Sequence, residues 1–310
     1  MALPPIKKAI VLSPKQSVNE AFAAILRHNF DDMVQWIPVA YDRQDIEGVH
    51  QVRVALRRLR SAISIFRKAI PRTITDPWNE EMRWVASEFG PARDLDVFIA
   101  EGLTEVAGKL PLPGGEEKIR ALALQHQDAA YARLRLLLDS DRYKAFATHF
   151  DQWITVHGWF QVDMPSEVRA NMGTGIVRYA KTVLGKRMSV ALATGASLES
   201  LSDEALHQLR IECKKLRYAT EFFSALFDPK GMAEFTLQLK NVQGLLGVMN
   251  DVAVMPHLLD SLLAGNNDPE AMRYAGALIG WRGYQSADIR KQLAAPWKQF
   301  SRTVSPWRKR

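Results

Sequence analysis

Cysteine is almost absent from this chain of 310 residues, which has a single one at Cys213. One cysteine excludes an internal disulfide and a zinc site built from several cysteines, and it fits a reducing cytoplasm. Long apolar runs are missing too, since no stretch approaches the roughly 18–20 residues that cross a bilayer. The segment from Met1 to Ser17 has no extended apolar core, so we expect no secretory signal, a cytoplasmic location and no membrane partner.

Strand-like patterns are also missing, because no stretch alternates apolar and polar residues with β-branched enrichment. Hydrophobic residues make up 47% of the chain and charged residues 24%, which fits a globular protein with a sizeable core. The apolar periodicity is helical throughout, and a capping box at Ser17 and Glu20 begins the first helix. The fold class is therefore predicted as all-α. The first helix runs from 17 toward 36 with its end marked by Pro38 and Asp42, and the third starts near Pro77 and passes Gly90-Pro91. Further helices are expected over about 45–69, 116–138, 141–157, 166–189, 202–227, 230–263 and 269–293.

Acidic residues are absent from Val49 to Thr75, although this segment holds seven arginines and lysines. The charge of the segment equals the net charge of the whole chain, which is +7. An ordinary solvated helix gains from acidic partners one turn away, and crowded like charges cost some tenths of a kcal/mol per pair. An uncompensated run therefore favours an anionic ligand, and a merely solvated basic face is the alternative.

An internal repeat relates the two halves of the chain. Residues 50–66 align with 207–223 at an offset of 157, with seven of the 17 positions identical. The same offset aligns Gly90 with Gly247 and holds without a gap to about residue 136. We therefore predict one domain over 1–310, made of a duplicated four-helix unit whose repeats cover 17–157 and 166–300.

The repeated helix carries a stripe of basic and imidazole side chains. At 100° per residue, four such residues in each copy fall on one flank of the apolar face, over about 15 Å of helix axis. Between the copies these positions change only from arginine to lysine, so the charge is kept. Guanidinium and ammonium groups in a row suit phosphate oxygens. The first stripe is His50, Arg53, Arg57 and Arg60, and the second stripe is His207, Arg210, Lys214 and Arg217.

Two carboxylates, Asp94 and Asp251, also align in the repeat. One interpretation combines them with the histidines as a metal or catalytic site. The favoured interpretation makes them counter-ions that orient Arg58 or Lys215. Because the neighbouring Asp96 has no acidic counterpart, a duplicated two-carboxylate site is not supported. We therefore predict a protein that is not an enzyme and has no catalytic residue, no metal site and no cofactor.

The paired motifs resemble the CHAD family, the conserved histidine α-helical domain, over about residues 17–300. They are His50-Gln-x-Arg53-x3-Arg57-Arg58-x-Arg60 with its second copy, and Gly90-x2-Arg93-Asp94 with Gly247-x2-Asn250-Asp251. The resemblance implies two four-helix bundles related by a pseudo-twofold axis. It also implies a central basic channel that binds inorganic polyphosphate, and a place at polyphosphate granules, where other granule proteins are possible partners.

On this resemblance the residues of both stripes become polyphosphate ligands. Neighbouring helices add three further candidates, which are Arg27, Arg83 and Lys240.

Two other functions remain open from the sequence. The stripes suit the backbone of RNA or DNA as well, with weak binding, although no aromatic side chains are interleaved with them as stacking platforms. An enzyme that acts on phosphoanhydrides is the less favoured alternative. It would need bound Mg²⁺ and placed carboxylates, which the stripes do not contain.

Overall fold

The computed structural model describes residues 3–5 and 10–308, and its regular structure there is helical apart from one isolated bridge between Ser17 and Gly175. The predicted all-α class is confirmed. The first half contains α1 (Val18–Asp42), α2 (Ile46–Phe66), α3 (Arg72–Val97), the π-helix η1 (Phe98–Leu103), α4 (Thr104–Val106), α5 (Pro113–Asp139) and α6 (Asp141–Thr155).

Two short helices lead into the second half, which repeats the order of the first. They are α7 (Gly158–Gln161) and α8 (Ser166–Met172). The second half contains α9 (Ile176–Thr194), η2 (Leu198–Ser200), α10 (Asp203–Phe223), η3 (Ser224–Leu226), α11 (Pro229–Leu263), α12 (Pro269–Gln292), α13 (Ala294–Arg302) and η4 (Pro306–Arg308).

The capping box predicted at the start of the first helix is present. The Ser17 hydroxyl accepts a hydrogen bond from the Glu20 backbone N–H at 3.2 Å, and Glu20 Oε2 accepts from the Ser17 N–H at 2.7 Å. The helix then runs through Pro38 to Asp42, which the sequence had placed at its end, and is capped by Arg43 in the left-handed conformation with φ of 52°.

The 157-residue offset of the sequence repeat is also the offset of the helices. Adding 157 to the first and last residue numbers of α2 gives the first and last residue numbers of α10. In the same way, the first residue of α3 corresponds to the first residue of α11, and the last residue of α4 corresponds to the last residue of α11. The continuous helix α11 is thus interrupted in the first half by the π-helical segment η1.

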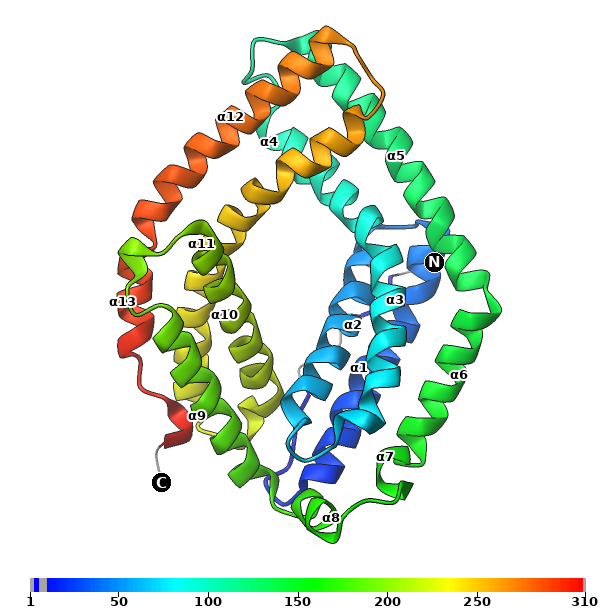
Figure 1. Cartoon of the computed structure of the whole chain (residues 1–310), viewed down its shortest axis with the longest axis vertical. Coiled ribbons are helices and arrows are strands. Elements are labelled where there is room, and N and C mark those ends of the chain that lie inside the picture. Colours follow the sequence, from blue (N-terminus) through cyan, green and yellow to red (C-terminus); the bar gives the residue numbers. More distant parts are fainter. Residues whose placement is uncertain (1–2, 6–9, 309–310) are drawn as a thin grey trace.

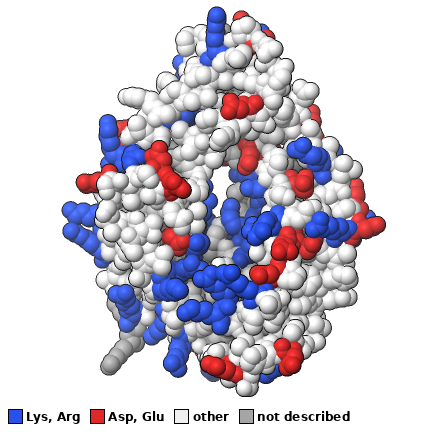
Figure 2. Space-filling view, viewed as in Figure 1, with Lys and Arg blue, Asp and Glu red and all other residues white. Residues whose placement is uncertain are grey.

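The helices form a ring in the ribbon view (Figure 1), and the space-filling view shows a hollow at its centre (Figure 2). On one side α2 packs between α1 and α3, and on the other side α10 packs between α9 and α11. The helices α2 and α10 contact each other, and α5 contacts both α11 and α12 where the two halves meet at the upper end of Figure 1. Within the described residues, no helix is long and apolar enough to span a membrane.

The apolar face predicted for the repeated helices is buried in both copies. Val52, Leu56 and Leu59 of α2 are fully buried, as are Leu209 and Leu216 of α10. Each stripe therefore lies next to a core face, on helices that cannot rotate without exposing it.

Cys213 occupies the corresponding core position of α10. Its thiol is fully buried, and burial raises its pKa to about 12. A thiol in this state packs as a small hydrophobic group, as the sequence predicted.

Candidate functional site

The first stripe lies along α2 with two of its arginines held against α3. Arg53 Nη1 donates a hydrogen bond to the Ala86 carbonyl at 3.3 Å, and Arg60 Nε donates to Asn79 Oδ1 at 3.1 Å. A Cβ on Gly90 would lie 3.2 Å from Arg53 Nη1, so the absence of a side chain at Gly90 gives Arg53 its place. Arg57, between the two, is exposed.

The second stripe lies along α10 in different surroundings. His207 is exposed, and its Nδ1 lies 3.0 Å from Asn250 Oδ1 on α11. Arg210 is half-buried, and its Nε has no hydrogen-bond partner among the described residues. Lys214 is half-buried, and burial together with the charges of Arg210 and the neighbouring arginines lowers its pKa to about 8.

The structure brings the two stripes together. Arg57 of the first stripe repels both Arg210 and Lys214 of the second. The Tyr218 ring on α10 lies 5.2 Å from the Arg217 guanidinium and 5.8 Å from that of Arg57, so it stands beside cations from both halves. Figure 2 shows lysine and arginine side chains gathered along the lower margin of the central hollow.

An ion pair between the halves fixes this meeting of α2 and α10. Arg58 Nη2 of α2 lies 3.3 Å from Glu221 Oε2 of α10. Glu221 Oε1 also lies 3.5 Å from Arg217 Nε in its own helix. One carboxylate therefore serves two cations, and the stripes around it keep an excess of positive charge.

Burial, with a smaller contribution from this excess of positive charge, lowers the pKa of several stripe residues. The pKa of Arg53, Arg60 and Arg210 is lowered, first because burial disfavours their charged forms and then because neighbouring arginines repel them. The pKa of His50 is also lowered, by burial first and by Arg93 second. A bound anion would relieve these penalties, because it returns an opposite charge to groups that have few carboxylates nearby.

Of the three further candidates, two lie on helices next to the stripes. Arg83 on α3 is exposed, and its charge acts on Arg60, so it extends the first stripe. Lys240 on α11 is exposed and corresponds to Arg83 at the repeat offset.

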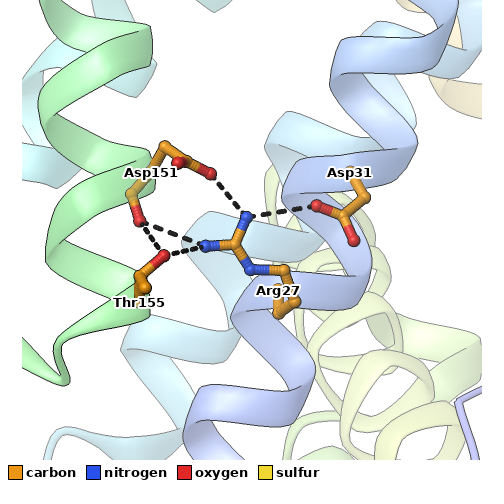
Figure 3. A network of polar contacts seen from close by, with 4 residues as sticks. All are labelled: Arg27, Asp31, Asp151 and Thr155. Carbon is orange, nitrogen blue, oxygen red and sulfur yellow. Dashed lines mark hydrogen bonds and ion pairs between the residues drawn. The ribbon is translucent and has the colours of Figure 1, made fainter.

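Arg27 is placed elsewhere by the structure (Figure 3). Its guanidinium joins α1 to α6, with Nη1 at 2.5 Å from Asp151 Oδ1 and 3.2 Å from Asp31 Oδ1. Its Nη2 donates to the Asp151 carbonyl at 3.1 Å and to the Thr155 hydroxyl at 2.9 Å. Because its donors are already occupied by carboxylate, carbonyl and hydroxyl oxygens, Arg27 is a link between helices and not part of the stripes.

The favoured sequence interpretation of Asp94 and Asp251 is wrong about their partners. Arg58 pairs with Glu221, and Lys215 Nζ pairs with Glu212 Oε1 at 2.6 Å.

The two aspartates instead act on the stripe arginines of their own halves. Asp94 on α3 attracts Arg53 on α2, and Asp251 on α11 attracts Arg210 on α10. The surrounding protein raises the pKa of Asp94, while Arg53 and Arg93 oppose that shift. Among the described residues, no group of three or more His, Cys, Asp or Glu side chains is placed to hold a metal ion.

Sequence reasoning missed Arg93 as a site residue. Arg93 lines the same cavity as Arg57, and its charge acts on His50. Arg93 directly precedes Asp94 in the repeated motif. Its counterpart in the second half is the uncharged Asn250, so it is not one of the positions at which a positive charge is repeated.

The observed architecture defines a class of duplicated all-helical proteins in which cations from both copies meet at an inner surface. The amino-acid sequence matches the CHAD domain over residues 24–260, and the chain belongs to the CHAD domain family. CHAD domains are generally associated with polyphosphate binding.

Solved structures share this fold. The CHAD domain from the plant Ricinus communis, known from a crystal structure, is 24% identical with a TM-score of 0.82, over 98% of this chain and 99% of that one. PptA from Streptomyces chartreusis is 16% identical with a TM-score of 0.66, over 91% of this chain and 100% of that one.

Curated relatives are longer than this chain. The proteins MT2285 and Rv2226 of Mycobacterium tuberculosis, both of uncharacterised function, are each 24% identical over 269 residues, which is 83% of this chain. The chain spans about half of their length, 49% in each case.

Proposed function

We propose that this protein binds inorganic polyphosphate along the first and second stripes, without catalysing a reaction. The observation that carries the proposal is the approach of Arg57 on α2 to Arg210 and Lys214 on α10. Two copies of one basic helix thereby present their cations to one space. Membership of the CHAD domain family, whose domains are associated with polyphosphate binding, supports the same ligand.

Polyphosphate fits this surface because it is linear and carries a negative charge on each phosphate. Arginine side chains offer forked N–H donors to its oxygens, and lysine adds a point charge. Binding would also favour the charged forms of Lys214 and His50, whose pKa values are lowered in the free protein. The ligand then releases condensed counterions, so affinity should fall steeply as salt increases.

Three further statements belong to this proposal. The halves act as two four-helix bundles related by a pseudo-twofold axis, which the common helix offset supports. The protein works in the cytoplasm at polyphosphate granules, where other granule proteins are possible partners. Arg83 and Lys240, exposed on the helices next to the stripes, add to the binding surface.

The double variant Arg53→Glu with Arg210→Glu tests the proposal. We expect it to abolish binding of long-chain polyphosphate, measured by titration at two salt concentrations, while circular dichroism shows unchanged helix content. The matched control is Lys144→Glu with Lys298→Glu, which makes the same charge change on exposed residues of the outer helices α6 and α13. Binding by the double variant equal to that of the control would contradict the assigned site.

An RNA of equal phosphate concentration serves as the competitor in the same titration. We expect it to displace polyphosphate weakly, because no aromatic platform accompanies the stripes. Efficient displacement by RNA would make nucleic acid the preferred ligand. Release of phosphate from polyphosphate in the presence of Mg²⁺, lost in Asp94→Asn, would contradict the non-catalytic part of the proposal.

A further inference from the structure

The two ends of the stripes face different surroundings. On the first stripe, Arg60 at one end donates to Asn79, and the positive charge of the exposed Arg83 acts on it. At the other end, His50 lies close to Arg93 and Glu47.

The second stripe also has an aspartate near its histidine end, although Arg217 at its other end lies 3.5 Å from Glu221. Its histidine end contacts Asn250, and Asn250 Nδ2 donates to Asp251 Oδ1 at 3.3 Å. Asp251 acts on Arg210 and Lys214. In both halves, therefore, the repeated aspartate is found at the histidine end of the stripe.

Beyond the histidine ends the hollow continues as a chamber of about 1380 Å³ between α3, η1, α5, α11 and α12. Much of its wall is apolar, with exposed side chains such as Val248, Val254 and Tyr284. The cation Arg282 in its wall is paired with Glu105 at 2.5 Å. Figure 2 agrees with this division, since the upper margin of the hollow shows few of the blue side chains that gather below.

Asp94 and Asp251 stand where the stripes meet this chamber. Both line it together with Arg57 and Arg93, and both are exposed to its solvent. The two carboxylates repel each other across the boundary. Among the described residues, neither forms an ion pair within 4.0 Å.

We propose that Asp94 and Asp251 set the limit of the polyphosphate-binding surface, repelling the polyanion from the chamber and keeping it on the two stripes. This inference rests on the proposed function. Two fixed negative charges at the boundary disfavour any phosphate placed there. The ligand is thereby kept on the stripes, which include Arg53 and Arg210, and out of the chamber beyond them.

Removal of the two carboxylates distinguishes this role from a merely structural one, because the two roles predict opposite changes in affinity for polyphosphate. If the aspartates serve as counter-ions that position Arg53 and Arg210, their removal should weaken binding. If they repel the ligand, their removal should strengthen binding and give long chains access to Arg93 and to Arg133 in the chamber wall.

The experiment is titration of Asp94→Asn with Asp251→Asn against polyphosphate of short and long defined length at pH 7.5. We expect affinity for the long chain to rise about tenfold, with a steeper salt dependence because more phosphates are contacted. The short chain, which already fits on the stripes, should gain less. Each single variant should show part of the gain, and thermal melting confirms that every variant is folded.

The matched control is Glu117→Gln with Glu234→Gln, which removes two exposed carboxylates, one from each half, outside the wall of the chamber. Affinity unchanged relative to this control, or lower than in the unmodified protein, would overturn the inference. The proposed function would still stand in that case if Arg53→Glu with Arg210→Glu abolishes binding. Failure of the unmodified protein to bind polyphosphate would instead refute the proposed function itself.

Discussion

The two stripes share a sequence pattern but differ in the environment that each half provides. His50 is half-buried near Arg93, whereas its counterpart His207 is exposed and contacts Asn250. The third residue of each stripe shows the opposite difference in burial, since Arg57 is exposed and Lys214 is half-buried. The repeat therefore keeps the positions of the charged groups, but the burial and neighbours of each group differ between the halves.

A second difference concerns the source of negative charge. In α10, Glu212 pairs with Lys215 and Glu221 pairs with Arg217, all within one helix. The corresponding positions of α2 hold Ala55 and Ser64, so α2 has no such acids. Arg58 of α2 pairs across the interface with Glu221 instead. The acid-free run noticed in the sequence is thus partly balanced by a carboxylate of the other half.

The largest expected difference between the stripes is their response to pH. Arg57→Ala and Lys214→Ala should each weaken polyphosphate binding about tenfold at pH 7, since hydrogen bonds to charged groups contribute about 1.5–3 kcal/mol. Because the pKa of Lys214 is about 8, this side chain loses its proton as pH rises through that value. The effect of Lys214→Ala should therefore shrink at pH 9.5, whereas guanidinium groups stay charged and the effect of Arg57→Ala should persist.

Titration of binding from pH 7 to 9.5 measures this contrast. Lys214→Arg is the control, and it should bind more tightly than the unmodified protein at pH 9.5. Parallel pH profiles for the two alanine variants would show that the buried environment of Lys214 has no bearing on the ligand.

A smaller effect is expected at the histidine of the first stripe. Arg93→Asn gives His50 the neighbour that His207 has, and removes a positive charge close to the ring. The pKa of His50 should rise, although burial, the larger cause, still holds it below the ordinary value. NMR titration of the ring resonances checks this. Arg133→Asn, on α5, is the control, and an equal rise in that variant would rule out a local effect of Arg93.

The smallest effects are expected at the paired glycines. Gly247→Ala meets no atom within 4 Å, so it should raise the free energy of unfolding by about 0.5–1 kcal/mol through helix propensity alone. Gly90→Ala would contact Arg53 Nη1 and displace it. It should therefore gain less stability and weaken polyphosphate binding, while Gly247→Ala leaves binding unchanged. Chemical denaturation measures the stability and titration measures the binding. Equal polyphosphate binding by the two variants would show that Gly90 does not contribute to the binding site.

The features that sequence predicted are those encoded by periodicity. Helical spacing placed Val52 and Leu56 in the core, and a constant offset related α2 to α10 down to their end residues. The same spacing aligned the stripes. These properties depend on residues near one another in the chain or on one fixed register.

The features that sequence missed depend on contacts between distant helices. Arg27 was a candidate because it is basic, yet it forms an ion pair with Asp151 on α6, which lies far along the chain. Arg93 lacked a repeated cation, and the partners of Asp94 could not be chosen without knowing how α3 packs on α2. The chamber likewise arises only when η1, α5, α11 and α12 come together.

The crossing of α5 and α12 has a consequence for how a ligand enters. A Cβ on Gly115 would lie 2.5 Å from the Glu270 carbonyl oxygen, so the two backbones nearly touch. Beside this point Lys118 Nζ lies 2.7 Å from Asp268 Oδ2 and 2.8 Å from Glu270 Oε2. This contact joins the halves at one end, and Arg58 and Glu221 join α2 to α10, so the halves are held together at two places. We expect a ligand of the proposed site to enter without separation of the halves, which favours thin, flexible, unbranched chains over bulky ones.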